Sequence, residues 1–228
     1  MSVYPSARAP EGALRRRWRL GAVASALALL LAGVLGGCSA LFSKSEPLSV
    51  RYFALPERAA TRTEGGVQDL APLRLGRVRG AAHLDVRMVH RRADNELVYD
   101  ESVRWSENPA RYLERAIAHA LFEERGIAQA MSGRALTLEA ELLAFEAVET
   151  EGAQRARVSV AFTLHDERTS RLVETLRVER ELTADAPDAL AAALASALDE
   201  AVNRVVERVL PELAAAREGS APVQAALP

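Results

Sequence analysis

The stretch LTLEAELLAFEAVETEGAQRARVSVAFTLH, residues 136–165, carries the clearest structural pattern in this 228-residue chain. Apolar and polar side chains alternate at both of its ends, which is the period of a β-strand with one buried face. Glu151-Gly152 lies between the two runs and is typical of a turn, so the stretch predicts an antiparallel hairpin. The alternating apolar positions are Leu136, Leu138, Ala140, Leu142, Ala156, Val158, Val160, Phe162 and Leu164.

Phe145 interrupts this alternation, because strict period two puts its ring on the polar face. We expect either a β-bulge before it or a contact of its ring outside the core. Residues 172–182 predict a third strand after a turn at 166–170, so the three strands form a meander. The acidic residues of this region are interpreted as the solvated face of a strand: Glu139, Glu141, Glu146, Glu149 and Glu151.

Shorter strands are predicted upstream of the meander. They cover residues 50–55, 73–78, 84–91 and 97–105, with a loop over 57–71, and the last two strands are expected to pair as a hairpin. Asn108-Pro109 predicts the start of a helix over 109–124, because Asn caps free amides and Pro suits the first helical position.

A long helix is predicted over residues 187–213. Its apolar residues form one stripe, from Leu190 to Leu213, so the helix is expected to pack on a sheet. Pro211 is expected to kink or end the helix near Glu207–Leu210. The fold class is therefore α+β: a two-layer domain with a mixed, mainly antiparallel sheet and two helices packed on one face. This domain spans residues 50–213, and 214–228 is expected to form a disordered tail.

The N-terminal segment predicts export. A basic segment that includes Arg15, Arg16, Arg17 and Arg19 precedes an apolar run over residues 20–35, which is too short for a comfortable membrane span. Gly36, Gly37 and Cys38, the single cysteine, then resemble the lipobox of bacterial lipoproteins. Residues 1–37 are thus interpreted as a signal peptide, with Cys38 as the lipidated first residue of the mature chain. An ordinary signal peptide or a signal anchor remains the alternative.

Composition limits the classes of partner. The whole chain has a formal net charge of −2, and removal of residues 1–37 takes away five arginines and one acid, so the rest is more acidic. This charge argues against nucleic acid as a partner. Residues 38–49 are interpreted as a flexible tether that reaches several tens of ångströms when extended. With its only thiol lipidated, the domain has no disulfide.

No catalytic or metal-binding spacing is recognised in the sequence. Each of the four histidines, His83, His90, His119 and His165, is interpreted as a surface or structural residue. Three aromatic residues are candidates for contact with a partner. Trp105, just before the first helix, either packs in the core or contacts a partner, and Tyr52 and Phe53 are candidates for the same two roles.

The order of elements and several residues resemble the ABC-type transport auxiliary lipoprotein family, whose best known type is the paraquat-inducible protein C lipoprotein. The resemblance covers roughly residues 52–209. It rests on the lipobox at Cys38, Arg51-Tyr52-Phe53-Ala54-Leu55-Pro56, the segment His83 to Arg91, Glu96-Leu97 leading to Arg104-Trp105, the Leu138 to Phe145 strand and the C-terminal helix.

This resemblance implies a non-enzymatic lipoprotein without a cofactor other than the lipid on Cys38. It implies anchoring in the inner leaflet of the outer membrane, facing the periplasm, and Ser39 after the cysteine is similar to the signal for that location. The implied partners are a mammalian-cell-entry (MCE) domain protein and an ABC permease and ATPase that move lipids or apolar compounds, with a homo-oligomeric ring as one arrangement. Two alternatives remain: a lipoprotein cofactor of cell-wall synthesis or outer-membrane assembly, and a lipid-anchored hydrolase.

Overall fold

A computed structural model describes residues 49–56, 70–150 and 152–218 of the chain. These residues belong to one compact unit that begins at Ser49. The expected signal peptide, Cys38, nearly all of the tether, most of the loop after Pro56 and the last ten residues lie outside the described part.

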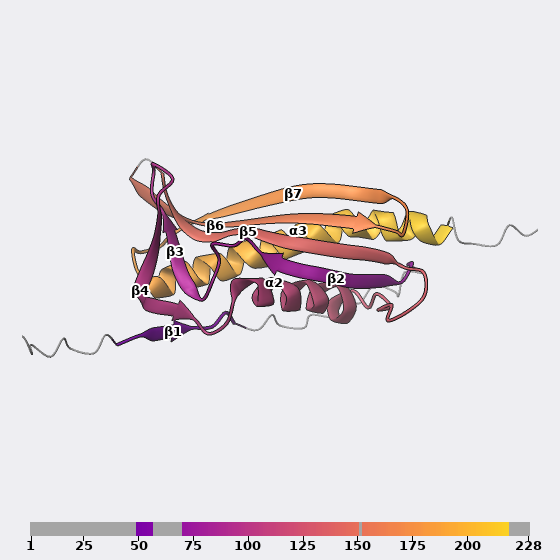
Figure 1. Cartoon of the computed structure of the whole chain (residues 1–228), viewed down its shortest axis with the longest axis horizontal. Helices are drawn as coiled ribbons and strands as arrows, with labels where there is room; N and C mark the ends of the chain where they lie inside the picture. The colour runs from indigo at the N-terminus through magenta and orange to yellow at the C-terminus, as the bar shows by residue number, and fades with distance from the viewer. Residues whose placement is uncertain (1–48, 57–69, 151, 219–228) are drawn as a thin grey trace, which may run out of the picture. The chain divides into compact units, whose positions relative to one another are not determined.

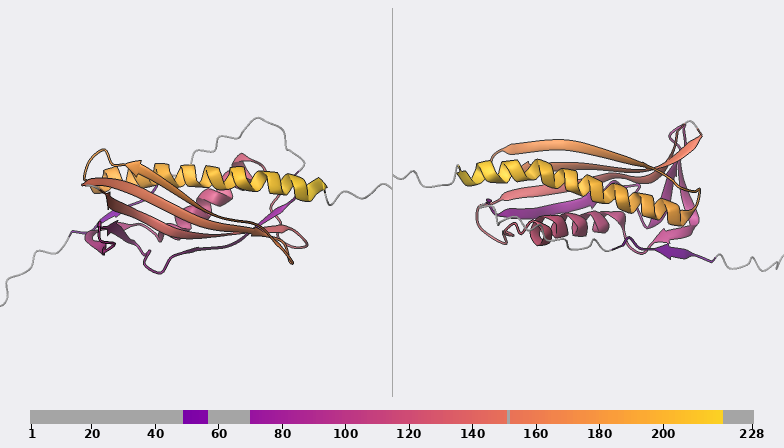
Figure 2. Two further views of the ribbon diagram at one scale, coloured as in Figure 1. Left: turned by 90° about the horizontal axis from the view of Figure 1, so that it is seen from above. Right: turned by 180° about the vertical axis from the view of Figure 1, so that it is seen from behind.

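The described domain contains one seven-stranded sheet and two helices on one of its faces, which confirms the α+β prediction (Figures 1 and 2). The strand order is β1-β4-β3-β5-β6-β7, and β2 pairs with β5 beside β3. The strands are β1 (Arg51–Phe53), β2 (Leu73–Gly80), β3 (Arg87–Arg91), β4 (Leu97–Trp105), β5 (Leu136–Thr150), β6 (Ala153–His165) and β7 (Ser170–Glu181).

The predicted meander is the centre of the sheet. β5, β6 and β7 pair in antiparallel order over nearly their whole lengths. The other edge of β5 is shared, because its first half pairs in parallel with β2 and residues 147–148 pair in parallel with β3. The predicted hairpin of β3 and β4 is confirmed as antiparallel, and β1 adds to β4 in parallel.

A bulge in β5 explains the position of Phe145. Leu142 pairs with Val160 and Ala144 with Ser159, so Leu143 is the extra residue of the bulged strand. The shift returns Phe145 to the face that carries Leu142, and the Phe145 side chain is 1% exposed in the core. The bulge, the first of the two expected explanations, is therefore confirmed.

The first helix begins as predicted. Asn108 caps α2 (Pro109–Ala118) by accepting a hydrogen bond of 2.9 Å from the Ala110 amide, with Pro109 in the first turn. The helix continues as the wider π-helical turn η2 (His119–Glu124), and Gly126 follows with φ of 64°. Glycine adopts this left-handed conformation at low cost, which suits the end of a helix.

The second helix is longer than predicted. α3 spans Pro187–Glu218 and passes through Pro211. Of the two effects expected of Pro211, a kink or an end, the end is therefore wrong, and residues 214–218 of the expected tail are helical. Leu213 is fully buried two residues later, and its carbonyl accepts a bond from the Ala71 amide. These contacts hold the last turns against the lost backbone hydrogen bond.

Two strands are shorter than predicted. β1 ends at Phe53, and β3 begins at Arg87 because the preceding residues form turns instead of strand. The Leu84 amide donates to the Ala81 carbonyl, and the Arg87 amide donates to the Asp85 carboxylate at 2.7 Å. Local hydrogen bonds of this kind compete with strand pairing. The segment 81–86 therefore crosses from β2 to β3 as an irregular connection.

Candidate functional site

Trp105 is a core residue. Its side chain is 1% exposed, and its ring meets the edges of Phe145 and Tyr112, with centroids 5.1 and 6.1 Å away. Of the two roles that the sequence left open, the structure therefore shows packing, because a side chain this buried presents no surface to a partner.

Tyr52 and Phe53 differ from each other although they are adjacent on β1. The Tyr52 side chain is 68% exposed, whereas Phe53 is half-buried against the core, with the Arg51 guanidinium 5.0 Å from its ring centroid. Tyr52 thus stays a candidate for contact with a partner. Cys38 lies outside the described residues.

A buried charge cluster lies on the sheet face opposite the helices, and the sequence interpretation missed it. Glu146 was interpreted as part of a solvated strand face, but it is 1% exposed. Ala144 and Val148, two residues away on either side, are buried on the same face. This apolar flanking was the signal that the position is covered, and the bulge decides only which face of the sheet covers it.

Arg91 holds the Glu146 carboxylate in a two-pronged contact. Its Nε donates to Oε1 at 2.8 Å and its terminal nitrogen donates to Oε2 at 3.0 Å. This geometry matches the planar fork of guanidinium to the two oxygens of a carboxylate. The hydrogen bond with Glu146 raises the pKa of Arg91 above its ordinary value. The contact joins β3 to β5 where their backbone pairing is short.

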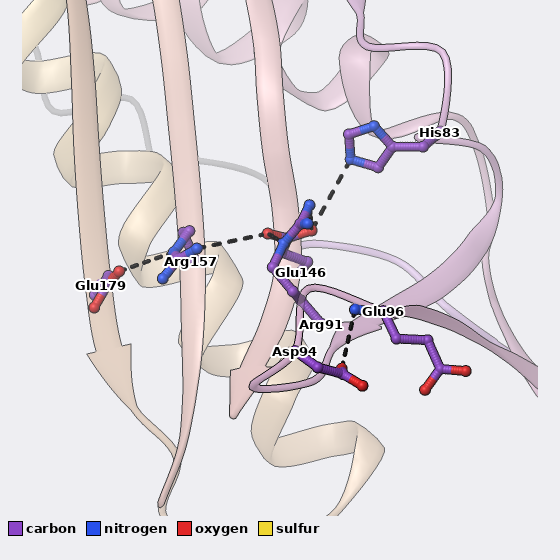
Figure 3. Close-up of polar contacts among 7 residues, drawn as sticks. All are labelled: His83, Arg91, Asp94, Glu96, Glu146, Arg157 and Glu179. Carbon is purple, nitrogen blue, oxygen red and sulfur yellow. Dashed lines mark hydrogen bonds and ion pairs between the residues drawn. The ribbon is translucent and has the colours of Figure 1, made fainter. Parts of the chain in front are cut away.

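Arg157 and His83 approach the same carboxylate from two other elements (Figure 3). A terminal nitrogen of Arg157 lies 3.9 Å from Glu146 Oε1, and its Nε donates to Glu179 on β7 at 2.8 Å. His83, from the connection before β3, places Nε2 3.9 Å from Glu146 Oε2, and this buried nitrogen has no hydrogen-bond partner in the described part. The cluster therefore links β3, β5, β6, β7 and the segment 81–86.

Further contacts fix the segment 81–86 beside this cluster. The Arg87 side chain donates to the Asp85 carboxylate at 2.7 Å, and this hydrogen bond lowers the pKa of Asp85 below its ordinary value. The Arg87 guanidinium also lies 4.2 Å from the ring centroid of Tyr99. Asn108 donates from Nδ2 to the Leu84 carbonyl at 3.2 Å, so the residue that caps α2 also holds this segment.

An open pocket lies between α2 and α3. It has a volume of about 490 Å³, and its apolar lining includes Leu55, Tyr112 and Leu198. Small side chains form part of its wall: Ala116 and Ala118 from α2, and Ala195 from α3. A pocket of this size falls within the range of about 300–1,000 Å³ in which proteins bind small molecules.

Charged side chains of both signs line the same pocket. Arg115, His119, Glu123 and Asp199 contribute to its wall. Arg115 donates to both oxygens of Glu107 at 2.5 and 2.7 Å, and its hydrogen bond lowers the pKa of Glu107. His119 belongs to the π-helical turn, with Nε2 3.5 Å from Glu123 Oε2 and Nδ1 3.2 Å from Glu124 Oε1. The pocket thus joins an apolar lining to a polar margin.

Within residues 49–56, 70–150 and 152–218, no three potential metal-ligating side chains come together. His83 lies near Glu146, His119 near Glu123 and Glu124, and Nδ1 of His165 lies 3.1 Å from the Asp166 carbonyl. Among the described helices, none is long and apolar enough to cross a membrane.

The domain is therefore a packed α+β fold with two distinct sites. A buried charge cluster lies on the sheet face opposite the helices, and a pocket lies between the two helices. The chain belongs to the ABC-type transport auxiliary lipoprotein component family, whose model matches residues 53–206. The match covers all strands after β1, α2 with its π-helical turn, α3 as far as residue 206, and the charge cluster.

Solved structures share this fold at low sequence identity. A protein from Xanthomonas campestris is 19% identical, with a TM-score of 0.63 over 71% of this chain and 95% of its own. An uncharacterised protein is 14% identical, with a TM-score of 0.57 over 71% of this chain and 99% of its own. No curated protein matches the chain significantly.

Proposed function

We propose that this chain is a non-enzymatic, lipid-anchored component of an ABC transport system that moves lipids or other apolar compounds across the bacterial envelope. The observation that carries the proposal is the family match over residues 53–206, which covers nearly all of the described domain. Its partners in this proposal are an MCE-domain protein and an ABC permease and ATPase.

The proposed anchor is a lipid on Cys38 in the inner leaflet of the outer membrane. Gly36, Gly37 and Cys38 follow an apolar run, and Ser39 comes after the cysteine. Two or more acyl chains suffice for stable anchoring, since each buried methylene contributes about 0.8 kcal/mol. The described domain begins at Ser49, so residues 39–48 would separate it from the lipid.

The proposed mode of action is docking to protein partners, with the domain facing the periplasm. Tyr52 supports this role, because a tyrosine that is 68% exposed combines a large apolar ring with a polar hydroxyl. It lies on β1, the first strand after the proposed tether. Assembly of several copies into a ring is part of the same proposal.

The test is affinity purification of the tagged, full-length protein from its native envelope in mild detergent, followed by mass spectrometry of its partners. We expect an MCE-domain protein together with an ABC permease or ATPase. Recovery should fall when Tyr52 is replaced by Ser, and the matched control is Thr175→Ser on β7, far along the sheet order from β1. Recovery of a cell-wall synthase or an assembly barrel instead would overturn the proposal and support the alternative.

A further inference from the structure

We propose that the pocket between α2 and α3 binds the acyl chain of a single-chain zwitterionic phospholipid. The inference rests on the proposed function and deepens it, because it gives the auxiliary lipoprotein a lipid site of its own within one copy of the domain.

The size of the pocket limits its occupant. A volume of about 490 Å³ suits a small molecule, whereas an α-helix with its side chains is about 10 Å across and needs a longer and wider groove. Ala116 from α2 and Ala195 from α3 both line this space, and their side chains are short. Their methyl groups, with Leu198 and the Tyr112 ring, make a wall that favours an apolar chain.

The charges on the pocket wall favour a headgroup that carries both signs. Arg115 and His119 come from α2 and its π-helical turn, and a phosphate would exchange with the carboxylates that they contact now, Glu107 and Glu123. Glu123 and Asp199 supply carboxylates suited to an amine, and the Glu123 side chain is 66% exposed. A phosphate next to an ammonium group, as in phosphatidylethanolamine, complements this mixture better than a purely anionic headgroup.

The π-helical turn places these groups. His119 is its first residue and Glu123 its fifth, and His119 Nε2 lies 3.5 Å from the Glu123 carboxylate. π-Helical turns are rare in proteins, and those that do occur often lie at functional sites. Asp199 comes from α3, so the polar margin is shared by the two helices that enclose the pocket.

The test uses photoactivatable lysophosphatidylethanolamine with a diazirine in its acyl chain, added to native envelope vesicles that contain the full-length protein. After irradiation, mass spectrometry maps the labelled peptides. We expect labels in residues 112–118 and 195–198. Ala195→Leu should fill the pocket and lower this labelling about tenfold or more, whereas Ala215→Leu, at an exposed position of the same helix, should not.

A second probe tests the headgroup. Lysophosphatidylglycerol with the same diazirine chain is expected to label the pocket about threefold less, since an exposed charge contact contributes up to about 1 kcal/mol. Glu123→Gln should remove this difference, and Glu114→Gln, on α2 but outside the pocket lining, should keep it. Equal labelling by the two probes in the wild type would overturn the headgroup assignment.

Labels spread over the surface, or labels that persist in Ala195→Leu, would overturn the pocket site. Ala195→Leu and Ala215→Leu are checked for native folding by circular dichroism and, as a second readout, by recovery of the ABC partners. Partners that still copurify with Ala195→Leu while labelling is lost would support both proposals. Pocket labelling without any transport partner would contradict the proposed function alone.

Discussion

At the scale of single residues, the ion pair of Glu146 and Arg91 is expected to contribute most to stability on the sheet face opposite the helices. The Glu146 carboxylate is 1% exposed, whereas the Arg91 side chain is 22% exposed and reaches water. A buried carboxylate without its partner is costly, but a partly exposed guanidinium is not. Removal of Arg91 should therefore destabilise the fold more than removal of Glu146.

We expect Arg91→Met to lower the free energy of unfolding by about 3–5 kcal/mol, because it removes both hydrogen bonds to the buried Glu146 carboxylate and leaves only the longer contacts with Arg157 and His83. Glu146→Gln should cost less, and the double variant should be more stable than Arg91→Met alone. Urea unfolding followed by the fluorescence of buried Trp105 measures this. A loss below about 1 kcal/mol in Arg91→Met would show that water or another cation replaces Arg91.

Asp85 gives the expected pH dependence at the same scale. The hydrogen bond from the Arg87 side chain lowers the pKa of Asp85 from its ordinary value of 3.8. A carboxylate with a lowered pKa in the folded state stabilises the fold above its unfolded pKa, and this contribution disappears as the pH falls through the folded value. The window is therefore below about pH 4.

We expect Asp85→Asn to be less stable than the wild type at pH 7, and the difference to shrink as the pH falls below about 4. Thermal unfolding at a series of pH values, with both proteins at equal ionic strength, measures the difference. A difference that stays constant down to pH 2 would mean that Asp85 acts only through its shape and neutral hydrogen bonds.

At the scale of elements, the bulge in β5 determines which side chains enter the core. Without the bulge, strict period-two alternation through Leu143 would put Phe145 on the sheet face opposite the helices and Glu146 among the apolar residues under the helices. The bulge thus makes both the aromatic contact with Trp105 and the ion pair with Arg91 compatible with one strand.

Deletion of Leu143 is therefore expected to leave a folded domain, because it removes only the extra residue. The pairs Leu142–Val160 and Ala144–Ser159 then follow each other regularly, and residues 144–150 stay on their present faces. Phe145→Ala is the harsher comparison, because it leaves a cavity in the core; it should cost about 3–5 kcal/mol while the strand keeps its register. Circular dichroism and limited proteolysis distinguish the two. A Leu143 deletion that is digested faster than Phe145→Ala would contradict the assigned register.

The sequence allowed prediction of those elements that are determined by the pattern of their own residues. The meander, the hairpin of β3 and β4 and the start of α2 at Asn108 follow from alternation and capping. The parallel pairing of β5 with β2 and β3 joins residues far apart in the chain, so no local pattern indicated it. The burial of Glu146 depends on those pairings, and the passage of α3 through Pro211 depends on the burial of Leu213, so both were missed.

At the scale of the whole domain, the two faces of the sheet have different characters. The helices cover one face and leave a pocket between them, while the other face carries ion pairs of Arg157 and Arg155 with Glu179 and Glu181. The first face is suited to an apolar ligand, and the second to contacts with polar surfaces. This division is what the proposed role in lipid transport requires, with the ligand and the protein partners on different faces.

The central claim, that the protein takes part in lipid transport, is tested most directly by the movement of newly made, isotope-labelled phospholipid between the inner and outer membranes. Cells that lack the protein are compared with cells that carry the wild type or Cys38→Ala at equal abundance. We expect transfer to slow in its absence, to recover with the wild type and to stay slow with Cys38→Ala. Equal transfer rates in all three strains would contradict the claim.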